Sequence, residues 1–196
     1  IGLLANEPAQ LGGAIDSEAA DKAARFLQLC DGFGLPVVSL VDTPGFMVGP
    51  DSERAAAVRH VSRMFVTAAG MTVPYGVIVL RKGYGLGAQA MAGGGFRIPR
   101  FIVSWPTGEF GPMGLEGAVR LGFRRELEAI DDPDERLRTF EQMVAAAYEH
   151  GKATNVAAAF EIDDVIDPVE SRRWIRSLLN SGEPPEGGRR PCIDTW

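Results

Sequence analysis

Short runs of apolar residues recur along the chain and predict buried strands. Pro36–Val41 is almost continuously apolar, Val77–Leu80 is rich in β-branched residues, and Phe101–Trp105 follows as a third run. Runs of this length and composition are typical of strands that are covered on both faces of a parallel sheet. Two shorter strands are expected at Ile1–Asn6 and Gly13–Ile15.

Segments with the helical period separate these runs. Between Ser17 and Asp31, apolar residues recur at Ala20, Ala23, Phe26/Leu27 and Cys30, which predicts an amphipathic helix. A second helix is expected over Ser52–Met71, with its apolar stripe at Val58, Val61, Phe65 and Ala68. An amphipathic helix from Asp131 to His150 and a last helix over Arg172–Leu179 follow. The chain therefore opens as β-β-α-β and belongs to the α/β class.

Two glycine-containing turns follow consecutive strands. Asp42–Pro50 contains a Pro-Gly pair directly after the first buried run, and Gly83–Ala88 follows the second. Ligands of α/β proteins bind at the carboxyl edge of the sheet, where these turns are expected. Glycines let backbone N–H groups approach a ligand closely. Each turn can therefore contribute an N–H group to a shared pocket for an oxyanion, phosphate or carboxylate.

The spacing Gly83-x-Gly85-x-x-Ala88 admits three interpretations. It matches a dinucleotide-binding fingerprint, but that site also needs an acidic residue at the end of the next strand, and Phe101–Trp105 ends without one. The turn can also serve only to pack a helix tightly against a strand. The remaining interpretation is an oxyanion hole made of backbone amides.

Composition excludes several classes of function. The chain has 196 residues, a net charge of −6 and mixed charges throughout, which argues against a nucleic-acid groove or a basic membrane-binding face. No apolar segment is long enough for a membrane span, so we expect a soluble, cytoplasmic protein. Two cysteines without CxxC spacing and two distant histidines give no metal site. Neither a P-loop nor a Gly-x-Ser-x-Gly elbow is present.

Four motifs resemble one known family. Asp42–Gly49 is similar to Asp-x-Pro-Gly-Phe-x-x-Gly, and Arg81–Gly85 to Arg-Lys-x-Tyr-Gly. Trp105–Ala118 is similar to Trp-Pro-x-x-x-x-x-x-Met-Gly-x-x-Gly-Ala, and Ile162–Pro168 to Ile-Asp-x-Val-Ile-x-Pro. These motifs occur in this order in the carboxyltransferase (β) subunit of biotin-dependent acyl-CoA and propionyl-CoA carboxylases. The chain resembles the C-terminal domain of that subunit.

The resemblance implies a crotonase-like fold, a spiral of repeated β-β-α units with C-terminal helices that help to join subunits. It also implies transfer of a carboxyl group from carboxybiotin, carried on a carrier protein, to the α-carbon of an acyl-CoA. In the family, carbon dioxide is released from carboxybiotin, the biotin enolate takes the α-proton, and the thioester enolate captures the carbon dioxide. Two oxyanion holes stabilise the enolates, and the C-terminal half holds the one for biotin. No metal is implied.

Carried over residue by residue, the resemblance places one backbone donor at Gly45/Phe46 and the other at Gly87 and Ala88. This chain has Leu86-Gly87-Ala88 where relatives usually have Gly-Gly-Ala, which leaves the register of the second donor open by one residue. Gly85, Leu86, Met47 and Gln89 are the expected contacts of biotin or substrate, and the family reads acyl length near Gln89. Arg81 is a candidate for holding a CoA phosphate or carboxybiotin; its structural alternative is an ion pair at the strand end.

The expected partners are an N-terminal carboxyltransferase half, a biotin carboxyl carrier or biotin carboxylase subunit, and further copies of the chain. We expect residues 1–180 to form the carboxyltransferase domain and 181–196 to be a flexible tail. One alternative is another crotonase-fold acyl-CoA enzyme, a hydratase, isomerase or decarboxylase, for which Glu109 is the candidate base. The other is a catalytically silent domain that assembles a carboxylase complex.

Overall fold

The computed structural model describes residues 1–180, whose centre is a parallel β-sheet. The strand order is β1-β2-β3-β4-β6, and β5 pairs in parallel with the end of β3. The strands are β1 (Gly2–Ala5), β2 (Val37–Thr43), β3 (Tyr75–Tyr84), β4 (Phe101–Ser104), β5 (Glu109–Gly111) and β6 (Asp164–Val165).

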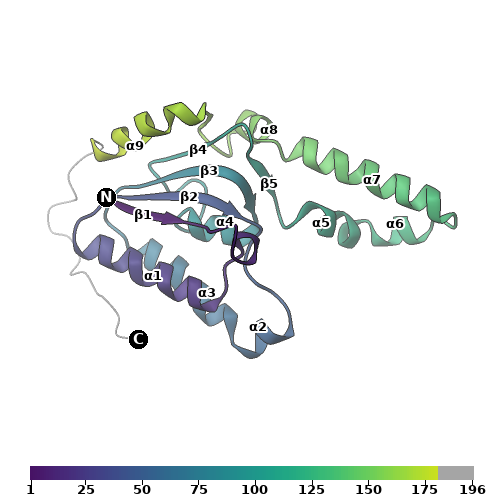
Figure 1. Ribbon diagram of the computed structural model, residues 1–196, viewed down its shortest axis with the longest axis horizontal. Helices are drawn as coiled ribbons and strands as arrows, with labels where there is room; N and C mark the ends of the chain where they lie inside the picture. Colours follow the sequence, from purple (N-terminus) through teal and green to yellow (C-terminus); the bar gives the residue numbers. More distant parts are fainter. Residues whose placement is uncertain (181–196) are drawn as a thin grey trace.

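Helices cover both faces of the sheet (Figure 1). On one face lie α1, α3 and α4, and on the other lies α9. The helices are α1 (Ser17–Gly32), α2 (Pro50–Arg54), α3 (Ala57–Ala69), α4 (Gly85–Met91), α5 (Leu115–Gly122), α6 (Arg124–Glu128), α7 (Pro133–His150), α8 (Ala153–Ala158) and α9 (Ser171–Leu179), with short 3-10 turns η1 (Leu11–Gly13) and η2 (Pro168–Glu170).

The central strands are buried on both sides, as their apolar runs predict. Val37 and Val77 point into the core beneath α1, α3 and α4, whereas their neighbours Val38 and Ile78 point into the core beneath α9. All four side chains are 1% exposed or less. Because successive residues of a strand face opposite sides, a continuous apolar run fills two cores at once.

Two predicted elements differ from the structure. The expected strand Gly13–Ile15 is reduced to η1 and a single bridge between Ile15 and Phe46. The expected helix Ser52–Met71 is two helices, because Ala56 adopts a left-handed conformation (φ 54°) that ends α2 before α3 begins. Val58, predicted on the apolar stripe, lies in the first turn of α3 and is 77% exposed.

The other predicted helices are confirmed. α1 buries Ala20, Ala23, Leu27 and Cys30, and both α7 and α9 span the predicted ranges within two residues. The tail from 181 to 196, with Cys192, lies outside the described residues. Among residues 1–180, no helix combines the length and apolar character that crossing a membrane requires.

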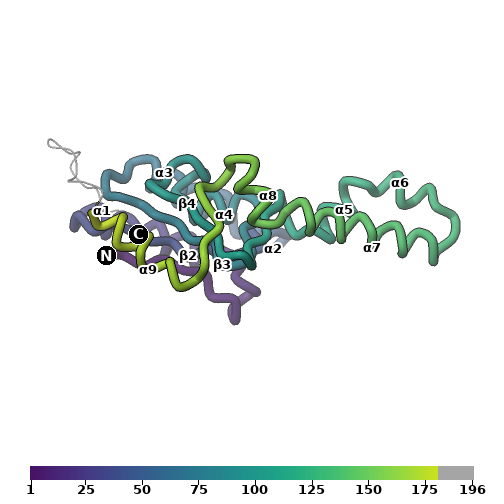
Figure 2. Tube along the Cα trace, turned by 90° about the horizontal axis from the view of Figure 1, so that it is seen from above, coloured from purple at the N-terminus to yellow at the C-terminus, as the bar shows by residue number. Residues whose placement is uncertain are grey.

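The segment α5–α6–α7 extends away from the sheet as an arm (Figures 1 and 2). α7 packs on α5 and α6, and none of its 18 residues is buried. Arg120 of α5 lies over the ring of Phe140 of α7, 5.0 Å from its centre. The arm is therefore held together by its own helices, and the sheet lies outside its main contacts.

Candidate active site

The two glycine-containing turns lie against each other at the carboxyl edge of the sheet. β2 leads into the Pro44-Gly45 turn and β3 leads into α4, whose third residue is Gly87. A Cβ atom placed on Gly87 would lie 2.7 Å from the Cα and carbonyl carbon of Gly45 and 3.1 Å from the nitrogen of Phe46. Only glycine allows so close an approach. The sequence prediction that both turns reach one sheet edge is therefore confirmed by this contact.

Thr43 and Ile15 hold the Pro-Gly turn through hydrogen bonds. Gly45 has φ 122°, a conformation that favours glycine, and its amide donates to Thr43 Oγ1 at 3.1 Å. The same hydroxyl donates to the Gly45 carbonyl at 3.2 Å. The amide of Ile15 donates to Gly45, and the amide of Met47 donates to Ile15. These contacts occupy the amides of Gly45 and Met47, and the amide of Phe46 takes no part in this pairing.

The second turn passes directly from β3 into α4. Gly85 has φ 58°, and Gly87 and Ala88 are buried while Leu86 is 62% exposed. In the regular bonding pattern of a helix, the carbonyl of the N-cap residue accepts from the fourth helical residue. Tyr84 is the N-cap here, so Ala88 is that fourth residue. The amides with no acceptor inside the helix are those before Ala88, Gly87 among them.

The remaining predicted contact residues lie around these turns. Gln89 is exposed on α4, and Met47 is partly buried beyond Phe46. Arg81, in contrast, forms a fork with Asp42 at the end of β2: its Nε lies 3.2 Å from Asp42 Oδ1 and its Nη2 lies 3.1 Å from Asp42 Oδ2. The hydrogen bonds that Arg81 donates to this carboxylate raise the pKa of Arg81.

Two tyrosine–glutamate hydrogen bonds near the second turn were missed by sequence reasoning. The hydroxyl of Tyr84 donates to Glu109 Oε2 at 2.8 Å, and the hydroxyl of Tyr148 on α7 donates to Glu116 Oε1 at 2.8 Å. Burial, together with the hydrogen bond to Glu109, raises the pKa of Tyr84 above its usual range. Tyr84 stands next to Gly85 in the Arg81–Gly85 motif, which was the available signal. The candidate base Glu109 is thus engaged by a buried hydroxyl.

The histidine nearest to the turns along the chain has a structural partner. His60 Nδ1 lies 2.7 Å from Asp21 Oδ2, and Arg63 Nη1 lies 2.6 Å from Asp21 Oδ1. These contacts tie α3 to α1. Within the described part of the chain, no three His, Cys, Asp or Glu side chains gather in a group that could hold a metal ion.

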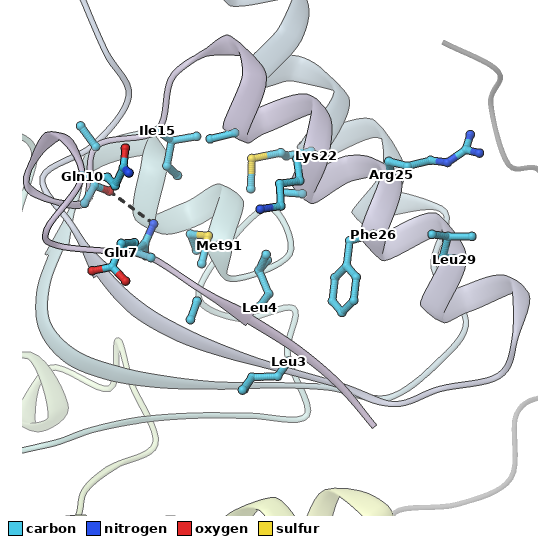
Figure 3. Close-up of a pocket in the computed structure, with 17 residues that line it drawn as sticks. Leu3, Leu4, Glu7, Gln10, Ile15, Lys22, Arg25, Phe26, Leu29 and Met91 are labelled. Carbon is cyan, nitrogen blue, oxygen red and sulfur yellow. Dashed lines mark hydrogen bonds between the residues drawn. The ribbon is translucent and has the colours of Figure 1, made fainter.

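A cavity of about 780 Å³ lies between β1 and α1 (Figure 3). Phe26 and Leu29 of α1 line it from one side, and Leu3 and Leu4 of β1 line it from the other. Met91, the last residue of α4, also reaches it, but Gly45, Phe46 and the first turn of α4 do not. The cavity is therefore separate from the pair of glycine turns.

The sequence of residues 1–181 matches the model of the carboxyl transferase domain family. The match extends over the whole described structure, so the chain belongs to this family.

Individual relatives agree with that assignment. The chain is 38% identical over 183 residues to the 12S subunit of methylmalonyl-CoA carboxyltransferase from Propionibacterium freudenreichii subsp. shermanii, a match that covers 91% of this chain and 34% of the subunit. It is 37% identical to the carboxyltransferase subunit of propionyl-CoA carboxylase from Haloferax mediterranei, covering 97% of this chain and 38% of that one. The chain thus spans about a third of the length of these relatives.

Solved structures give the same fold. A transcarboxylase 12S structure, described as a hexamer with methylmalonyl-coenzyme A bound, superposes with a TM-score of 0.82 at 35% identity, covering 97% of this chain and 37% of that chain. A single-chain, multi-domain long-chain acyl-CoA carboxylase superposes with a TM-score of 0.80 at 64% identity, covering 90% of this chain and 18% of that one. The predicted α/β fold of crotonase type is confirmed by these neighbours.

Proposed function

We propose that the protein transfers a carboxyl group from carboxybiotin to the α-carbon of an acyl-CoA, and that this chain is the biotin-side half of the catalytic unit. The observation that supports the proposal is the contact between Gly87 and the Gly45-Phe46 peptide, which brings two backbone turns side by side. We call this pair of adjoining turns the cradle. Such a cradle suits a reaction in which charge develops on carbonyl oxygens, because preorganised N–H donors stabilise that charge.

The residues of the turns suit a ureido carbonyl in their chemistry, because backbone N–H groups are hydrogen-bond donors. The cradle is lined by backbone, since a single Cβ on Gly87 would fill the space against Gly45. Thr43 holds the Gly45 amide, which leaves the amide of Phe46 and those at the start of α4 as the donors we assign to the ligand. When bound, carboxybiotin supplies the carboxyl group, and negative charge develops on its ureido oxygen as that group leaves.

The half of the unit that binds the thioester is assigned to chain outside these 196 residues. The coverage of the relatives supports this assignment, since the match takes up about a third of their length. We propose that an N-terminal carboxyltransferase half and a biotin carboxyl carrier complete the enzyme. The 12S relative is described as a hexamer at the core of a multienzyme complex, which supports a homo-oligomer for this protein as well.

We further propose that the substrate is a long acyl-CoA. Identity is 64% to the long-chain acyl-CoA carboxylase but 37–38% to the methylmalonyl- and propionyl-CoA enzymes. The exposed aliphatic side chain of Leu86, at the position where relatives usually carry glycine, adds apolar surface beside the turn. A series of acyl-CoA substrates tested on the full-length enzyme should give a higher kcat/KM for palmitoyl-CoA than for propionyl-CoA.

The test of the reaction itself is transfer in reverse, from malonyl-CoA, methylmalonyl-CoA and the α-carboxylated form of a long acyl-CoA to free biotin, by the full-length natural protein. We expect carboxybiotin to form in step with loss of the CoA-bound carboxyl group. Hydration, isomerisation or decarboxylation of acyl-CoA at a rate independent of biotin would favour the other crotonase-fold activities instead. A folded full-length protein with none of these activities would indicate an assembly domain.

A further inference from the structure

A bulge in β3 lies just before the second glycine turn. The register of β2 and β3 is constant from Val37↔Tyr75 to Val41↔Val79, but the next pair is Thr43↔Gly83. One residue of β2, Asp42, therefore stands opposite three residues of β3, 80–82. A bulge leaves backbone groups without ladder partners and redirects the strand, so something must hold it.

The carboxylate of Asp42 bonds to the bulged residues. Its Oδ1 accepts from the amide of Lys82 at 3.1 Å and from Arg81 Nε at 3.2 Å, and its Oδ2 faces Arg81 Nη2 at 3.1 Å. The side chain of Asp42 is 11% exposed and that of Arg81 is 48% exposed. A carboxylate that accepts hydrogen bonds from both a guanidinium group and a backbone amide fixes the bulge in one geometry.

Asp42 is itself fixed from the side of β1. Its amide donates to Asn6 Oδ1 at 3.1 Å, and Asn6 Nδ2 donates to the carbonyl of Gly13 at 3.4 Å. Gly13 packs so closely that a Cβ there would lie 2.2 Å from the Asp42 carbonyl oxygen. The chain around Asp42 therefore has little freedom to shift.

The bulge determines which residues of the two turns meet. It places Gly83 opposite Thr43, and from there β2 runs two residues to Gly45 while β3 runs four residues to Gly87. Slipping this pairing by one residue would move one turn along the other by about 3.3 Å. The contact between Gly87 and Gly45 would then be lost.

We propose that Asp42 and Arg81 form a positioning pair, which sets the spacing of the two oxyanion turns by fixing the bulge in β3. This inference rests on the proposed function for its catalytic consequence. It gives Arg81 a role different from the one that the resemblance allowed, that of a ligand for a CoA phosphate or carboxybiotin. Two of its guanidinium nitrogens are already bonded to Asp42.

The test uses Arg81→Lys and Asp42→Asn in the full-length enzyme. Lysine keeps the positive charge but cannot form the fork, and asparagine, with one acceptor oxygen and no charge, cannot hold both the guanidinium fork and the Lys82 amide. We expect either change to lower kcat by about 10- to 100-fold, because a misplacement of about 1 Å costs that much. The KM values for acyl-CoA and biotin should change less than about twofold. The double variant should be no slower than the slower single variant, since both break one interaction.

Arg54→Lys is the matched control, because Arg54 also pairs with an aspartate but lies exposed on α2. It should leave both kcat and KM unchanged. If Arg81→Lys kept kcat and raised the KM for CoA substrates or biotin instead, Arg81 would be a ligand and the positioning pair would be overturned.

Hydrogen exchange of the Lys82 amide gives a reading that does not depend on activity. Both variants should accelerate this exchange by about tenfold or more, while amides of α1 exchange at the wild-type rate. If the wild-type enzyme transfers no carboxyl group, the proposed function fails and the exchange still tests the pair. Unchanged exchange in Asp42→Asn would overturn the positioning role at any level of activity.

Discussion

The region of the glycine turns and the arm formed by α5–α6–α7 are stabilised in opposite ways. Around the turns, Thr43, Gly87 and Ala88 are buried, and the contacts of Gly45 with Thr43 and Ile15 all come from within the described chain. The arm has an 18-residue helix without a buried residue. Two of its leucines, Leu121 and Leu137, are 67% and 55% exposed.

This difference distinguishes the turns, whose structure this chain forms by itself, from the arm, whose exposed surface is left for a partner to cover. Glycines and a buried threonine fix the turns without outside help. A helix of 18 residues is about 27 Å long and gains most of its stability from packing, so aliphatic residues on an uncovered helix indicate a surface that another chain covers. In the proposed enzyme, the turns stabilise the developing negative charge and the arm binds another chain.

The largest expected effect is on the isolated chain. We expect residues 1–196 alone to give no measurable carboxyl transfer between acyl-CoA and biotin, because the half proposed to bind the thioester is missing. Adding an N-terminal half should restore turnover. The measurement is carboxybiotin formation with malonyl-CoA, methylmalonyl-CoA and an α-carboxylated long acyl-CoA, and turnover by the chain alone would show that the turns need no partner.

The second effect compares one substitution in the two regions. Gly87→Ala keeps the amide but places a methyl group 2.7 Å from Gly45, so the turns must separate. We expect kcat of the full-length enzyme to fall by about 100-fold. Gly122→Ala at the end of α5, where a Cβ meets nothing within 4 Å, is the control and should have no effect. Equal rates for both variants would mean that the close approach has no catalytic role.

The third effect concerns association through the arm. Leu137→Ser should weaken self-association or partner binding by about tenfold, since an exposed leucine covered on assembly contributes about 1–2 kcal/mol. Arg138→Ser on the same helix is the matched control. Sedimentation or light scattering across a concentration series would measure the change. A Leu137→Ser protein that associates as tightly as the control would remove this part of the arm from the interface.

The smallest expected effect is on stability and its pH dependence. Partial burial opposes the charge of Asp21, but hydrogen bonds from His60 and Arg63 outweigh it and hold the pKa of this carboxyl below its usual value. A lowered pKa stabilises the fold above the unfolded value of about 3.9, and the stability is lost as the pH falls through the folded value. Asp21→Asn should therefore lower Tm by about 2–4 °C at pH 7. This difference should vanish in the most acidic conditions that the fold survives; a constant difference would contradict the ion-pair explanation.

Much of the fold could be predicted because local patterns decide it. The apolar runs gave β2, β3 and β4, and the helical period gave α1 and α7, since a buried face requires apolar residues at fixed intervals. The break at Ala56 could not be predicted. Alanine is the strongest helix former and carries no signal for a left-handed conformation.

For the candidate site, sequence reasoning predicted the two turns but missed the contacts that position them. The turns were predictable because their glycines can be read directly from the sequence. The hydrogen bonds of Asp42 to the bulge depend on a register shift between β2 and β3, which the sequence does not show. The hydrogen bond between Tyr84 and Glu109 joins residues 25 positions apart. The periodicity of α7 predicted a helix, but the same pattern suits packing within a chain or against a partner, so its exposure was not predictable.

The most direct test of the central claim is a crystal structure of the full-length enzyme with biotin bound. We predict that the ureido oxygen lies about 2.7–3.1 Å from the amide nitrogen of Phe46 and from the amide nitrogen of Leu86 or Gly87, the distance range of an oxyanion hole. A biotin held through side chains such as Arg81, or one bound away from both turns, would contradict it.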